Sequence, residues 1–139
     1  MRVGVLLVTH AGIGQAMLDC VLDMMGELPL RVAVLGVDRA DDSGVLEQEA
    51  KQLLVQLEGT DAQAADVLIL TDAFGATPGN IASSLARSDR TALVAGLNLP
   101  MLVRVMNYPD AGLEELSTIA VEGGRRGTLR CSSDAEHHG

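Results

Sequence analysis

Four short runs of aliphatic residues recur along this chain, and a stretch with helical periodicity follows each of them. The runs are continuously apolar rather than alternating, which is typical of strands covered on both faces of a sheet. A repeated strand–helix order predicts an α/β fold with an open, mostly parallel sheet and helices on both of its faces. The predicted strands cover residues 3–8, 31–37, 67–71 and 91–96.

The intervening segments place apolar residues at helical spacing. Thr77 and Pro78 are typical of a helix cap followed by proline at the first helical position, and Pro100 plays the same part further on. Residues 128–130 could add one short edge strand. The expected helices cover residues 15–25, 43–57, 78 onward, 101–107 and about 113–126.

The length of 139 residues suits one domain, which we expect to cover residues 1–131. Residues 132–139 are polar and are expected to form a flexible tail.

Composition excludes several classes of partner. Aromatic residues make up 1% of the chain and the net charge is −9, so a base-stacking or phosphate-binding surface for nucleic acid is not expected. No apolar run is long enough to span a bilayer, and no secretory leader pattern is present. The two cysteines lack metal-site spacing, and no nucleotide-binding glycine motif occurs. We therefore expect a cytoplasmic protein without metal or other cofactor and without direct membrane insertion.

A histidine stands at the end of the first predicted strand. Ligands of parallel sheets bind beyond the carboxyl ends of the strands, and a neutral imidazole is a competent nucleophile near pH 7. Gly12 and Gly14 would leave space for an anion beside His10, and Thr9 adds a hydroxyl donor. A histidine that only forms hydrogen bonds within a loop is the alternative; the position at a strand end favours function.

An aspartate follows the third predicted strand. A carboxylate bonded to one ring nitrogen of His10 would fix its tautomer and leave the other nitrogen free to attack. Asp72 could instead be a helix-capping residue, but Gly75, Ala76 and Thr77 resemble a second anion-binding turn.

Two further polar segments lie at predicted strand ends. Asn98 either shapes the loop after the fourth strand or is an ordinary turn residue. Asp38, Asp41 and Asp42 are expected to form a solvated acidic turn.

Three ordered blocks resemble the mannose-type IIA component of the bacterial phosphoenolpyruvate:sugar phosphotransferase system. They are residues 9–12 (THAG), 71–78 (TDAFGATP) and 95–102 (AGLNLPML). The resemblance covers nearly the whole chain, from residue 1 to about 129. One departure is that the family usually has Gly-Gly-Ser-Pro where this chain has Gly-Ala-Thr-Pro at residues 75–78.

The resemblance implies a histidine phosphocarrier. His10 would accept a phosphoryl group from the phosphohistidine of the carrier HPr and pass it to a IIB partner, and Asp72 would orient its ring. It also implies a homodimer that exchanges a C-terminal edge strand, a part that residues 128–130 could play. The phosphoryl oxygens would be held by backbone N–H groups and hydroxyls of Thr9, Gly12, Gly14, Gly75, Ala76 and Thr77.

Two other function classes stay open at this point. The chain could be a regulatory module whose phosphorylated and free forms engage different targets without sugar transport. It could also be a flavodoxin-like domain that binds a small molecule, with His10 as an incidental polar residue.

Overall fold

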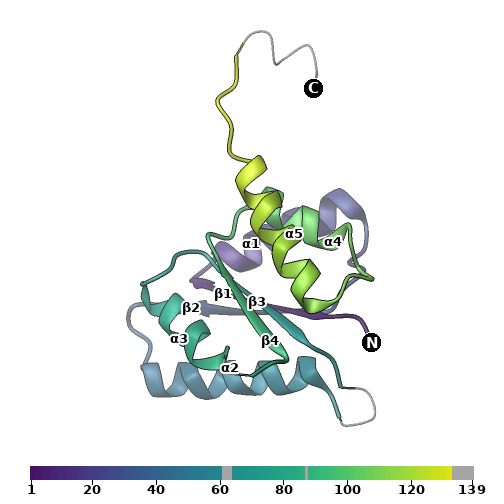
Figure 1. Ribbon diagram of the computed structural model, residues 1–139. Coiled ribbons are helices and arrows are strands. Elements are labelled where there is room, and N and C mark those ends of the chain that lie inside the picture. Colours follow the sequence, from purple (N-terminus) through teal and green to yellow (C-terminus); the bar gives the residue numbers. More distant parts are fainter. Residues whose placement is uncertain (61–63, 87, 133–139) are drawn as a thin grey trace.

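The computed structural model describes residues 1–60, 64–86 and 88–132. Strands and helices alternate along these residues in the predicted order (Figure 1). The strands are β1 (Gly4–His10), β2 (Val32–Val37), β3 (Val67–Thr71) and β4 (Thr91–Ala95). The helices are α1 (Ile13–Met25), α2 (Ser43–Glu58), α3 (Thr77–Leu85), α4 (Leu99–Met106) and α5 (Leu113–Arg126).

The strands form a parallel sheet in the order β2-β1-β3-β4. From β1 the chain first moves outward to β2, and it then crosses to the other side of β1 to form β3. The strand order therefore reverses between β1 and β3, and such a switch point opens a crevice at the carboxyl ends of the strands. His10 is the last residue of β1, and Asp72 directly follows β3.

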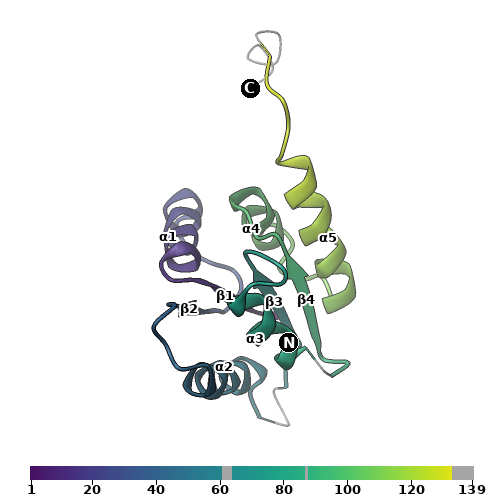
Figure 2. The same cartoon turned by 90° about the vertical axis from the view of Figure 1, so that its left-hand side faces the viewer.

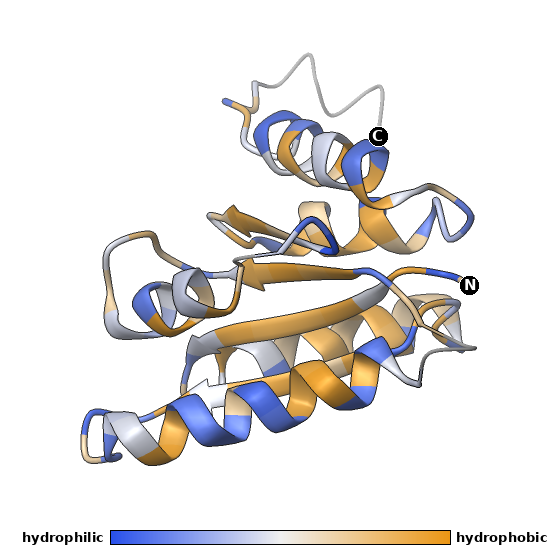
Figure 3. Ribbon diagram, turned by 60° about the horizontal axis from the view of Figure 1, so that its bottom comes forward, coloured by the Kyte–Doolittle hydropathy of each residue, from blue (hydrophilic) through white to orange (hydrophobic). Residues whose placement is uncertain are grey.

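Helices cover both faces of the sheet, as Figure 2 shows, so the predicted fold class is confirmed. Side chains alternate along β1: Val5 and Leu7 pack with α1, α4 and α5, whereas Leu6 and Val8 pack with α2 and α3. Figure 3 shows the consequence as a colour pattern, since the strands are mostly hydrophobic while α2 carries hydrophobic and hydrophilic residues in turn. The apolar strand runs reflect burial on both faces.

The starts of three helices differ from those expected, and α4 begins at Leu99 rather than at residue 101. Helix α1 begins at Ile13, because Gly12 adopts φ +87° and turns the chain into the helix at once. Thr77 is the first residue of α3 rather than its cap, which is Ala76. Pro78 is therefore the second helical residue, where its missing N–H is still not needed by the helix.

The carboxyl-terminal segment leaves the body of the molecule beyond α5 (Figure 1). Residues 128–130, expected as a short edge strand, form no strand within the described part of this chain. Of the predicted tail, residues 133–139 lie outside the described residues. In the ranges that the structure describes, none of the helices combines the length and the apolarity needed to cross a bilayer.

Candidate functional site

The structure brings His10 and Asp72 into direct contact at the switch point between β1 and β3. His10 Nδ1 lies 2.8 Å from Asp72 Oδ2, and the backbone N–H of His10 donates to the same oxygen at 3.1 Å. The backbone N–H of Ala73 donates to Asp72 Oδ1 at 3.1 Å. The His10 side chain is 47% exposed and that of Asp72 is 11% exposed. The carboxylate is thus fixed within the fold, while the imidazole faces outward.

These contacts determine which ring nitrogen of His10 can react. Burial of the carboxyl group raises the pKa of Asp72, but the hydrogen bonds from the His10 ring and backbone, with the charge of His10, outweigh burial. The pKa of Asp72 is therefore lowered, and its ionised carboxylate can only accept a hydrogen bond from the ring at neutral pH. The ring proton is accordingly on Nδ1, and the lone pair of a neutral ring is on Nε2.

An open cavity of about 430 Å³ lies beside His10, and we call it the His10 cavity. One wall is the loop after β2, residues 38–42, and another is the start of α3. As the first residue of α3, Thr77 has a backbone N–H without a helical partner, which is a favourable feature for an anion. The residues that line the His10 cavity are His10, Val37, Asp38, Arg39, Asp41, Asp42, Ser43, Thr77 and Pro78.

Thr9 and Gly14 are joined by a hydrogen bond, and neither residue lines the His10 cavity. Thr9 is completely buried; its hydroxyl donates to the carbonyl oxygen of His10 at 2.8 Å and accepts from the N–H of Gly14 at 2.8 Å. A Cβ at Gly14 would meet Thr9 Oγ1 at 3.0 Å and Val34 Cγ1 at 3.2 Å. Neither residue is free to bind a phosphoryl group, in contrast to the expectation from the sequence.

The other glycines expected at the site shape its loops. Gly12 and Gly75 have φ values of +87° and +86°, a region that other residues rarely adopt. Both are exposed, and neither lines the His10 cavity. Ala76 is half-buried and caps α3 with extended backbone. Gly12 and Gly75 therefore allow the chain to turn from β1 into α1 and from the Asp72 segment into α3.

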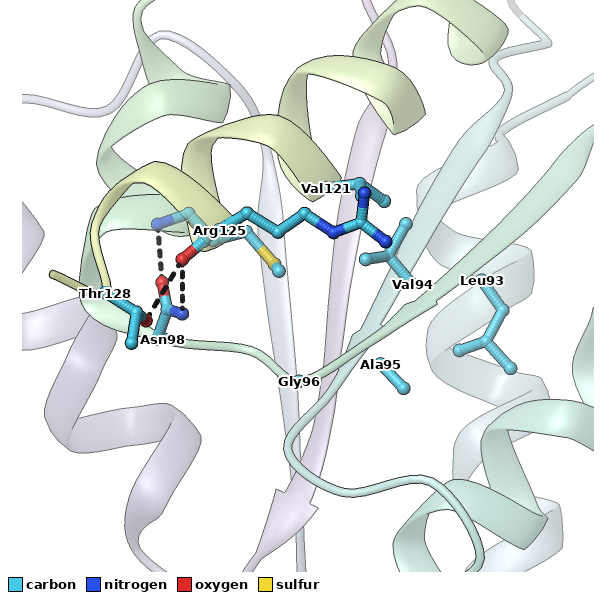
Figure 4. A pocket seen from close by; sticks show the side chains of 10 residues that line it. Leu93, Val94, Ala95, Gly96, Asn98, Val121, Arg125 and Thr128 are labelled. Carbon is cyan, nitrogen blue, oxygen red and sulfur yellow. Dashed lines mark hydrogen bonds between the residues drawn. The ribbon is translucent and has the colours of Figure 1, made fainter.

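Asn98 lies in the connection between β4 and α4 and does not line the His10 cavity. Its Oδ1 accepts from the N–H of Met101 at 2.9 Å, and its Nδ2 donates to the carbonyl oxygen of Gly124 at 3.1 Å. The side chain thus caps α4 and joins it to α5. It also borders an open groove of about 650 Å³ between β4 and α5, the β4 groove, into which Arg125 extends near Val94 and Val121 (Figure 4).

Arg39 is a residue that sequence reasoning did not single out. It shares the His10 cavity with the histidine and is exposed. The available signal was its place just after the second strand, because the carboxyl ends of all parallel strands meet at one edge. Within the described residues, no group of three or more His, Cys, Asp or Glu side chains could hold a metal ion.

Comparisons with known proteins agree with the fold. The family model EIIA-man, described as PTS system fructose IIA component, matches residues 4–118. The PTS IIA protein associated with the fucose utilization operon from Streptococcus pneumoniae is 25% identical, with 94% of this chain and 93% of that chain covered and a TM-score of 0.78. The mannose/sorbose specific IIA subunit from Enterococcus faecalis is 22% identical, with coverage of 95% and 96% and a TM-score of 0.80. No curated protein matches the chain.

Proposed function

Since the chain belongs to the EIIA-man family of phosphotransferase-system IIA components, we propose that it is a phosphocarrier whose phosphoryl group is held on His10. The donor is phospho-HPr, the acceptor is a IIB partner, and the exchange takes place in the cytoplasm. The observation that carries this proposal is the 2.8 Å contact between His10 Nδ1 and Asp72 Oδ2 beside an otherwise exposed ring.

The chemistry is in-line phosphoryl transfer between two imidazoles. Nε2 of His10 attacks the phosphorus with its lone pair, and an N–P bond forms while the N–P bond of the donor histidine breaks. The donor imidazole leaves with that electron pair. The His10 ring then carries a positive charge, because Nδ1 keeps its proton and Nε2 bears phosphorus. Asp72 stabilises this charge, and transfer to IIB runs the same steps in reverse.

The phosphoryl oxygens need donors on the open side of the ring. The Thr77 hydroxyl and N–H border the His10 cavity at the start of α3, whose partial positive charge favours an anion. The backbone between Gly75 and Thr77 connects Asp72 to this helix. These groups support a phosphoryl site between His10 and α3.

A homodimer with exchanged C-terminal segments is the proposed assembly. Within the described residues, β4 pairs with β3 alone, so its outer edge has unused backbone N–H and C=O groups. The β4 groove lies along this edge, and residues 128–132 leave the body of the molecule (Figure 1). We propose that residues 128–130 of a second copy pair antiparallel with β4, because an added strand would occupy the groove and satisfy that edge.

A reconstituted phosphorylation assay tests the carrier function. With phosphoenolpyruvate, enzyme I and HPr, the chain should gain one acid-labile, alkali-stable phosphate. His10→Gln should abolish it. A chain in which His137 and His138 are both replaced by Gln is the matched control and should still be phosphorylated, since the site resides at His10.

Absence of phosphate on the wild-type chain would overturn the proposal. Such a result would favour a flavodoxin-like domain that binds a small molecule. Phosphorylation without onward transfer to any IIB subunit would instead favour the regulatory module.

A further inference from the structure

The pairing of β1 with β2 brings Arg39 to the same cavity as His10. Val37 is the partner of His10 in the parallel register, and the N–H of Ala11 donates to the Val37 carbonyl oxygen at 3.0 Å. Arg39 follows two residues later, in the 38–42 loop that forms a wall of the His10 cavity. The cavity therefore has a guanidinium-bearing residue on one wall and the start of α3 on another.

The carboxylates of the same loop are bonded to backbone groups. Asp41 Oδ2 accepts from the N–H of Asp38 at 3.0 Å, Asp38 Oδ1 accepts from the N–H of Ala40 at 3.3 Å, and Asp42 Oδ1 accepts from the N–H of Gly44 at 3.4 Å. In the part of the chain that the structure describes, no carboxylate oxygen lies within 4.0 Å of the Arg39 guanidinium. Among the described residues, the Arg39 guanidinium thus lines the cavity without an ion pair to a carboxylate.

A phosphoryl group on His10 would be repelled by nearby negative charge, and Arg39 can reduce that repulsion. A phosphoryl group carries about −1.5 to −2 charges at pH 7. The chain already has a net charge of −9, and Asp38, Asp41 and Asp42 line the same cavity. Repulsion by these carboxylates raises the free energy of the phosphorylated state. Arg39 is the one Lys or Arg among the described lining residues, and its planar fork matches phosphoryl oxygens.

We propose that Arg39 binds the phosphoryl oxygens on His10 Nε2 and offsets the repulsion from the three aspartates of its loop. This inference rests on the proposed carrier function and adds a phosphoryl-binding residue to it. Arg39 lies on the β2 side of the His10 cavity, and the start of α3 forms another wall of it.

A small donor separates this role from docking of a protein partner. Phosphoramidate transfers its phosphoryl group directly to imidazole: Nε2 of His10 forms the new N–P bond, the P–N bond of phosphoramidate breaks, and ammonia leaves. No protein partner takes part, so any effect of Arg39 on this reaction is an effect on the phosphoryl group. The rate is followed by mass spectrometry of intact chains in which His137 and His138 are replaced by Gln, so that His10 is the remaining imidazole.

Arg39→Gln should slow phosphorylation by phosphoramidate roughly twofold to fivefold, the size of an exposed charge contact. Arg39→Lys, which keeps the charge and loses the fork, should fall between Arg39→Gln and the wild type. Arg2→Gln removes the same charge from an exposed residue outside the His10 cavity, where Arg2 pairs with Asp110, and is the matched control, which should react at the wild-type rate. Equal rates for Arg39→Gln and Arg2→Gln would overturn the role of Arg39.

A second readout follows the phosphoryl group itself. In ³¹P NMR of the phosphorylated chain, the midpoint of the pH titration of the phosphohistidine resonance should move up in Arg39→Gln, because a neighbouring cation favours the more highly charged form. An unmoved midpoint also contradicts the inference. A wild-type chain that takes up no phosphate from either HPr or phosphoramidate overturns the carrier function and this inference with it, whereas a reactive wild type with an indifferent Arg39 overturns the inference alone.

Discussion

Asp72 Oδ2 accepts hydrogen bonds from both the ring and the backbone of His10, at 2.8 Å and 3.1 Å. One carboxylate oxygen therefore fixes the orientation of the imidazole relative to the strand that bears it. The second oxygen is bonded to the N–H of Ala73, so the carboxylate itself cannot rotate without breaking that bond. The contacts with Asp72 therefore determine both the tautomer of His10 and the orientation of its ring relative to β1.

Asp72→Asn should leave the fold intact and slow phosphotransfer to His10 by about tenfold to a hundredfold. The amide keeps the shape but loses the charge that stabilises the cationic ring, and hydrogen bonds to charged groups contribute about 1.5–3 kcal/mol. Rapid-quench measurement of phosphate uptake from phospho-HPr checks the rate, and circular dichroism checks the fold. Unchanged kinetics would remove Asp72 from its assigned role.

The lowered pKa of Asp72 predicts a pH-dependent contribution to stability. A carboxyl whose pKa is lower in the folded than in the unfolded chain stabilises the fold above its unfolded pKa, near 3.8 for aspartate. That contribution is lost as the pH falls through the lowered folded value. The difference in free energy of unfolding between wild type and Asp72→Asn should be present at pH 5 and should shrink below about pH 4. Urea titrations across this range measure it, and a difference that persists at acid pH would contradict the prediction.

Thr9→Val should destabilise the chain by about 1–3 kcal/mol, because the buried N–H of Gly14 loses its acceptor. Thr9→Ser retains the hydroxyl and is the control, with a smaller loss from the missing methyl group. Urea denaturation compares the two. If Thr9→Val is as stable as Thr9→Ser, the hydroxyl does not hold the start of α1 as the structure indicates.

Gly79→Ala should be destabilising by roughly 1–3 kcal/mol, since a Cβ there would meet the Ala73 carbonyl oxygen at 2.5 Å. The backbone next to Asp72 would have to move, so phosphotransfer should slow as well. Gly44→Ala is the matched control in α2, where a Cβ meets its nearest atom at 3.7 Å. That change should be neutral or stabilising by about 0.5–1 kcal/mol, because alanine favours the helix. Thermal unfolding of both variants gives the comparison.

Truncation after Gly127 tests the proposed assembly. The shortened chain keeps α5 and should sediment as a monomer, while the full chain should sediment as a dimer. Analytical ultracentrifugation over a range of concentrations measures both. A full chain that stays monomeric, or a truncated chain that still dimerises, would contradict strand exchange at β4.

The fold was predictable because burial on both sheet faces leaves continuous apolar runs in the sequence. The contact of His10 with Asp72 was predictable as well, because His10 ends β1 and Asp72 directly follows the neighbouring parallel strand β3. The Thr9 hydroxyl was misplaced for a physical reason: its direction depends on α1 beginning at Ile13, which brings the N–H of Gly14 onto it. Arg39 was not predicted because the aspartates around it are typical of a solvated turn. The structure shows that Asp38 and Asp41 accept hydrogen bonds from backbone N–H groups instead of pairing with Arg39.

The direction of β1 also places the amino terminus and the His10 side chain at opposite ends of this strand. The strand runs for seven residues from Gly4 to His10, which spans roughly 20 Å. His10 is the last residue of β1, so the amino terminus, marked N in Figure 1, lies toward the other end of this strand. A fluorescent reporter or an immobilising linker attached to Met1 would leave the histidine rim unobstructed for kinetic work in real time.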